Sequence, residues 1–209
     1  KHIIGILQMQ SNQIILAVLS SSALFGVYSY YNTIIAQFSL LMGSFFKTYT
    51  PRFLNIINSK KNNSYPSAIS FVKRSLFWYL VLLPIFLFSV YLIIKLINSY
   101  SCYFINIINK EYIDNLMLLY FMLISWSIGN IRSFIDLWQY EKQNRVNIFI
   151  ITIQIIALFV LYFGGIFFFK YFGINGIIVN QIILYILIIM INYYCFNYFI
   201  IGERLDKKN

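Results

Sequence analysis

Charged residues are scarce in this chain, and the residue types that usually support catalysis are scarcer still. Of its 209 residues only 11% are charged, six are acidic and one is a histidine. A soluble domain carries about a quarter charged residues. Hydrophobic residues here reach 60%, and the mean hydropathy is +0.74. Because a water-soluble fold does not cover this much apolar surface, we expect the solvent of the protein to be lipid.

The shortage of histidine and cysteine excludes several kinds of site. The single histidine is His2, so neither a Ser-His-Asp triad nor a histidine metal site can be assembled. No phosphate-binding glycine loop is present, since Gly164 and Gly165 lie within an apolar run. Cys102 and Cys195 are expected on opposite sides of the bilayer, where they cannot form a disulfide. We therefore expect no enzyme, no catalytic residue, no metal and no cofactor.

Long apolar runs make up most of the sequence. A helix of about 20 apolar residues crosses the hydrocarbon core of a bilayer and satisfies its own backbone hydrogen bonds. Pro51 is expected to end the second run, and Pro84 lies within the third, where membrane helices tolerate proline. The pattern predicts an all-α membrane protein, a single bundle over residues 1–209. Its six expected spans are 3–24, 27–49, 71–97, 116–138, 146–169 and 176–200.

The basic residues predict the orientation of these spans. The chain has 16 of them and a formal net charge of +10. All except Lys95, Lys110 and Lys170 fall on one side of the predicted membrane. The positive-inside rule places that side, and with it both termini, in the cytoplasm. Because the positive charge lies between spans and not on one polar face, we do not expect nucleic acid to be a partner.

Polar side chains at membrane depth are the candidate functional groups. Arg132 and Asp136 are four residues apart on one helix face and can pair. The pair either lines a cavity near the cytoplasmic mouth or lies at the membrane edge with its charges reaching water. The uncharged candidates either line a hydrophilic path or bond one helix to another. These candidates for a substrate-binding cavity are Asn12, Gln13, Gln37, Asn130, Gln154 and Asn180, with Gln181 beside them.

Two further patterns concern packing. Ser125, Gly129 and Ser133 recur every four residues, which favours close helix packing in lipid; a shorter pair, Ser39 and Gly43, is as easily due to chance. Residues 52–61 mix apolar and basic side chains, so they form either a short amphipathic helix on the inner leaflet or a solvated loop.

Several short segments resemble one transporter family. They are Asn-Gln-Ile-Ile-Leu at 12–16 with Phe-Gly-Val-Tyr at 25–28, Asn-Arg-Val-Asn at 144–147, and Gly-Ile-Asn-Gly-Ile-Ile-Val-Asn at 173–180. With Pro51 and the basic loop after it, they resemble the second half of bacterial polysaccharide flippases. These proteins export O-antigen and capsule repeat units and belong to the multidrug/oligosaccharidyl-lipid/polysaccharide exporter superfamily. The family usually has an aspartate where Asn12 stands, which counts against a proton- or cation-linked role for this position.

The resemblance implies the C-terminal six-helix half of a twelve-helix transporter in the bacterial inner membrane. It implies transport of an undecaprenyl-pyrophosphate-linked oligosaccharide by alternating access, with membrane lipids around the protein. The partner would be the N-terminal bundle or a second copy of this chain, and we expect no transport by one bundle alone. The alternatives are a drug/cation antiporter of the same superfamily, which would favour buried acidic groups, and a membrane-embedded polysaccharide polymerase or glycosyltransferase, which would need a large external loop. A non-catalytic membrane scaffold is a third.

Overall fold

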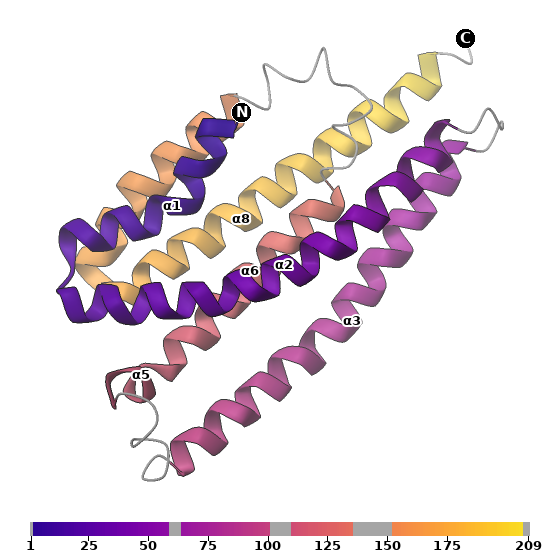
Figure 1. Ribbon diagram of the computed structural model, residues 1–209. Helices are drawn as coiled ribbons and strands as arrows, with labels where there is room; N and C mark the ends of the chain where they lie inside the picture. Colours follow the sequence, from indigo (N-terminus) through magenta and orange to yellow (C-terminus); the bar gives the residue numbers. More distant parts are fainter. Residues whose placement is uncertain (1, 59–63, 101–109, 136–151, 207–209) are drawn as a thin grey trace.

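The computed structural model describes the backbone of residues 2–58, 64–100, 110–135 and 152–206, and no strand occurs within these ranges (Figure 1). The all-α prediction is therefore confirmed. Residues 152–159 are helical and lead directly into the π-helix. The named elements are α1 (His2–Leu19), α2 (Ser22–Asn58), α3 (Ser64–Ser99), α5 (Lys110–Asp114), α6 (Leu116–Ile135), the π-helix η2 (Val160–Gly164) and α8 (Gly165–Asp206).

A serine turn separates the first two helices. The Ser20 hydroxyl donates to the Leu16 carbonyl at 2.6 Å, which satisfies one of the last carbonyls of α1. The Leu24 amide donates to the Ser21 hydroxyl at 3.4 Å, the bond of an N-cap residue at the start of α2. Because each serine occupies a helix end, the chain can reverse here within a few residues, and α1 packs on the first part of α2 (Figure 1).

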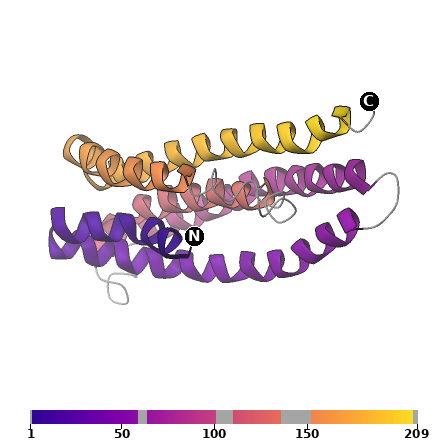
Figure 2. The ribbon, with the colours of Figure 1, turned by 90° about the horizontal axis from the view of Figure 1, so that it is seen from above.

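Helix α2 contradicts the expectation that Pro51 ends the second span. The helix continues through Pro51 to Asn58 and is curved along its length in Figure 2. Proline removes one helical hydrogen bond, but the next turn gains burial, because Phe53 is only 1% exposed. Phe53 packs in a cluster with Tyr49, Ala68, Val72 and Phe134. The segment after Pro51 is thus an amphipathic helix as far as Asn58, and its apolar face packs on protein.

Helix α8 is two helices joined at Gly173. This residue has φ 60° and ψ −147°, a conformation that is essentially restricted to glycine. The segments before and after Gly173 pack on each other in antiparallel fashion, since Gly176 lies against Phe168 and Gly164 against Asn180. Further from the turn, the same two segments share a cluster of Ala157, Leu161, Leu184 and Ile188. Residues 152–172 and 174–206 therefore form an antiparallel hairpin (Figure 1).

Three stretches of the described chain are helical, long and apolar enough to cross a membrane, and not the six that we expected. They are Pro66–Ser99, Leu116–Phe134 and Thr152–Tyr194. The last contains the hairpin at Gly173, so its two arms correspond to the expected spans at 146–169 and 176–200. The first two expected spans correspond to the helices α1 and α2, and neither is among these three apolar stretches. Serine, asparagine, glutamine and threonine interrupt their apolar runs, and part of α1 lies at protein interfaces.

The core lies where α1, α2, α6 and the hairpin meet. Its buried residues are Ile15, Leu16, Val27, Tyr28, Tyr31, Ile35, Leu118, Met122, Leu123, Ile177 and Ile178. On α2, Tyr31 and Ile35 follow the adjacent pair Val27 and Tyr28 at three- or four-residue spacing, so a single helix face is buried. Helix α3 packs on α2 and α6 at the edge of the bundle, and only 6% of the residues in its most apolar 18-residue stretch are buried. Most of α3 is therefore available to lipid.

Candidate functional site

A chain of uncharged polar side chains connects α1 to α8 within the core. The Asn12 amide donates to the Gln181 carbonyl oxygen at 2.6 Å, and the Gln181 amide donates to the Tyr185 hydroxyl at 2.8 Å. Asn12 is only 3% exposed. Its burial follows from the local sequence, because Ser11, Asn12, Ile15 and Leu16 occupy one face of α1. We call Asn12, Gln181 and Tyr185 the amide relay.

Two other helices border the amide relay. From α2, the buried Tyr28 presents its hydroxyl to the Asn12 side chain. From α6, Gly129 allows the Tyr185 ring to approach, and a Cβ atom at Gly129 would lie 3.0 Å from that ring. The relay therefore lies at the meeting point of α1, α2, α6 and α8. The expected packing of the stripe around Gly129 is confirmed at that residue, whereas a Cβ at Gly43 would meet nothing within 4 Å.

Asn180, the neighbour of Gln181, bonds to the π-helix on the opposite arm of the hairpin. Its amide nitrogen lies 3.3 Å from both the Val160 and Leu161 carbonyls. A π-helical turn lengthens the backbone loop and leaves carbonyls in need of donors, a feature often found at functional sites. Asn180 is 3% exposed, and a Cβ atom at Gly164 would lie 2.5 Å from its side-chain oxygen. The side chain of Asn180 thus stabilises the two arms of the hairpin against each other.

A second polar group joins α2, α3 and α6. The Trp126 indole donates to the Ser39 hydroxyl at 2.8 Å, and the Tyr79 hydroxyl donates to the Ser127 carbonyl at 2.9 Å. Asn130 lies one turn further along α6 and faces the Tyr79 hydroxyl. These bonds join neighbouring helices side by side. The group therefore fits interhelical bonding better than a continuous hydrophilic path.

The remaining candidates are spread over the bundle. Gln13 and Gln154 are half-buried, and Gln37 is exposed on α2. Arg132 is half-buried near the end of α6. Asp136 lies outside the described residues, so its expected pairing with Arg132 stays a prediction. Of the expected set, the structure thus brings Asn12 and Asn180 to the region around Gln181.

The sequence analysis missed the two tyrosines of this region, Tyr28 and Tyr185. Aromatic residues make up 20% of the chain, so the sequence did not indicate which of them would form hydrogen bonds with the polar side chains. The one available signal was spacing, because Gln181 and Tyr185 are four residues apart and share a helix face.

The chemistry of the amide relay is that of neutral hydrogen bonding. Amides and phenols both donate and accept, which suits hydroxyl groups and water, and none of the three side chains carries a charge. Within the described residues, no group of three or more histidine, cysteine or acidic side chains gathers as a metal site. Comparisons with protein-family models, with curated proteins and with solved structures found no match to this chain.

Proposed function

We propose that this chain is one six-helix bundle of a bacterial inner-membrane flippase that moves lipid-linked oligosaccharide repeat units between leaflets. The observation that carries the proposal is the amide relay, in which the buried Asn12 bonds to the half-buried, uncharged Gln181 and Tyr185 between apolar helices. The short segments that resemble polysaccharide flippases at 12–16 and 173–180 contain Asn12 and border Gln181. The family resemblance and the polar core thus point to the same part of the molecule.

The neutral character of the relay favours a sugar over a cation. Sugars present many hydroxyl groups and little charge, and amide and phenol side chains can bond to them in either direction. A cation-coupled antiporter would favour a buried carboxylate, but the first 110 residues contain no aspartate or glutamate. In the described core, the relay consists of asparagine, glutamine and tyrosine, none of which carries a charge.

The proposed mechanism needs two bundles. A polar headgroup must cross the hydrocarbon core in a hydrated cleft, because each unsatisfied polar group in lipid costs several kcal/mol. The isoprenoid tail can remain in the bilayer. One bundle offers one wall of such a cleft, so the second wall comes from a partner bundle or from a second copy of this chain. Rocking of the two walls would expose the headgroup to each side in turn, with both termini of this chain in the cytoplasm.

The test is transfer of a fluorescent lipid-linked oligosaccharide in proteoliposomes. The complete gene product is reconstituted, and a membrane-impermeant quencher reports how much fluorophore has reached the outer leaflet. We expect transfer, and we expect Gln181→Leu to slow it at least tenfold because both relay bonds are lost. Ser89→Ala is the control, since Ser89 is exposed on α3, its hydroxyl bonds to the Ile85 carbonyl of the same helix, and its replacement should leave the rate unchanged.

Two outcomes would overturn the proposal. One is the absence of oligosaccharide transfer by a folded gene product that transports a cationic dye, which would favour the antiporter. The other is equal transfer rates for Gln181→Leu and the unmodified protein, which would give the relay a purely structural role.

A further inference from the structure

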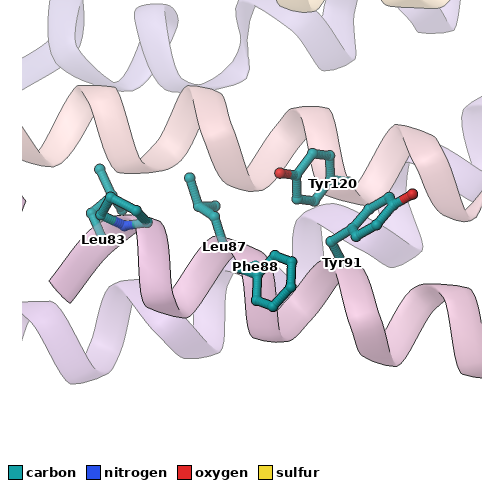
Figure 3. Close-up of a pocket in the computed structure, with 6 residues that line it drawn as sticks. Leu83, Leu87, Phe88, Tyr91 and Tyr120 are labelled. Atoms are coloured by element: carbon teal, nitrogen blue, oxygen red, sulfur yellow. The ribbon is translucent and has the colours of Figure 1, made fainter.

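An apolar groove runs along the outer face of the bundle between α3 and α6. It has a volume of about 480 Å³ and is lined by Leu83, Pro84, Leu87, Phe88, Tyr91 and Tyr120 (Figure 3). Only Tyr120 comes from α6, and its ring lies 5.9 Å from that of Tyr91. Phe88 is 61% exposed, so the groove faces the surroundings of the bundle and not its core.

The groove continues into a second, polar hollow. This hollow of about 270 Å³ is lined by Tyr91, Ile94, Lys95, Asn98, Ser99 and Met117. Tyr91 lines both, and Figure 3 shows its hydroxyl directed away from the apolar part, towards the C-terminal end of α3. Pro84, Phe88, Tyr91, Lys95 and Asn98 follow one another at three- or four-residue spacing, so they share a face of α3.

The polar hollow lies at the level expected for lipid headgroups. Lys95 is one turn before the end of α3 at Ser99, and the end of a membrane-crossing helix lies at the interface with water. Lys95 has no ion pair with any described residue. Lys110, Glu111 and Asp114 of α5 belong to the same end of the bundle but do not line the hollow. The ammonium of Lys95 is therefore the charge that a ligand in this hollow would meet.

We propose that the groove binds a phospholipid, with one acyl chain along Leu83–Phe88 and the phosphate against Lys95 and Asn98. An aliphatic chain fits an apolar wall that already faces lipid, and a phosphate complements an ammonium that has no partner in the described chain. A second protein helix would cover the apolar part equally well but would leave Lys95 without an anion. The order of surfaces along the face, apolar first and cationic at the interface, matches the order of groups in a phospholipid.

The experiment is native mass spectrometry of the detergent-purified protein with an equimolar mixture of phosphatidylglycerol and diacylglycerol of identical acyl chains. We expect phosphatidylglycerol to remain bound in preference, and we expect Lys95→Gln to reduce its retention at least threefold. Lys95→Arg should keep it. The control is Lys170→Gln, because Lys170 is an exposed lysine of α8 that lines neither hollow. Helix content by circular dichroism checks that each variant is folded.

A separate variant tests the acyl-chain part of the proposal. Phe88→Ala removes a wall of the groove, and it should lower the retention of phosphatidylglycerol while leaving Lys95 in place. Glycerol phosphate, which has the headgroup chemistry without the tails, should not displace the lipid. Equal retention by Lys95→Gln and the unmodified protein, equal binding of diacylglycerol and phosphatidylglycerol, or displacement by glycerol phosphate would each overturn the proposal.

Discussion

Replacing Gly176 by alanine should destabilise the hairpin of residues 152–206, because the added methyl group meets backbone of the opposite arm. A Cβ atom at this position would lie 2.2 Å from the Phe168 carbonyl oxygen and 2.7 Å from its carbon. Both are backbone atoms, so the clash is relieved only when the two arms of the hairpin move apart. Overpacking of this kind costs about 1–3 kcal/mol. Alanine stabilises a helix relative to glycine by about 1 kcal/mol, which offsets part of this cost.

Gly43→Ala is the matched control, because a Cβ atom there meets nothing within 4 Å and only the helix-favouring effect remains. We therefore expect Gly176→Ala to unfold at lower denaturant than the unmodified protein, and Gly43→Ala at the same or higher denaturant. The free energies of unfolding of the two variants should differ by about 2 kcal/mol. The assay is an SDS titration in mixed micelles, followed by the helical circular dichroism signal. Equal midpoints for the two variants would refute the close approach of Phe168 and Gly176.

Two other changes test the turn and the extension of α2. Gly173→Ala places a side chain at φ 60° and should cost about 1–3 kcal/mol, seen as a lower SDS midpoint; an unchanged midpoint would mean that the turn adopts another conformation in the membrane. Phe53→Ala empties a buried site beside Tyr49 and Phe134 and should cost about 3–5 kcal/mol; a small loss, within about 0.5 kcal/mol, would show that the helix beyond Pro51 does not pack on α3 and α6.

The positions of the helices were predictable from the sequence because apolar length sets them. The expected span at 116–138 begins at the same residue as α6, and the break between 169 and 176 contains Gly173, where the hairpin turns. Pro84 lies within α3 as expected. In each case a local signal, either a long apolar run or a glycine at a turn, decides the outcome without help from distant residues.

Tertiary contacts decided the features that were not predictable. Pro51 is a local signal to end a helix, but Phe53 gains burial only because Ala68, Val72 and Phe134 come to meet it from α3 and α6. No local pattern contains that information.

The same holds for the candidate site. Asn12 and Gln181 are 169 residues apart in the chain, so their bond depends on how α1 and α8 pack. The sequence marked both as polar groups at membrane depth, but it did not indicate that Asn12 would bond to Gln181 while Gln37 would face outwards. The unexpected partners are tyrosines, whose hydroxyl groups are indistinguishable from those of their many neighbours until the helices are placed.

The exposure of α3 also affects how this protein can change over evolutionary time. Only 6% of its most apolar stretch is fully buried, and the exposed side chains there, such as Leu82, Ile85 and Ile93, have lipid and not a specific neighbour around them. Lipid chains accept leucine, isoleucine, valine and phenylalanine almost equally, so exchanges among them on α3 have little effect on stability. Selection then retains the hydropathy of the helix and not the identity of its residues. Homologous helices should lose sequence identity fastest along α3, while Gly173 and Gly176, which backbone geometry constrains, should persist longest.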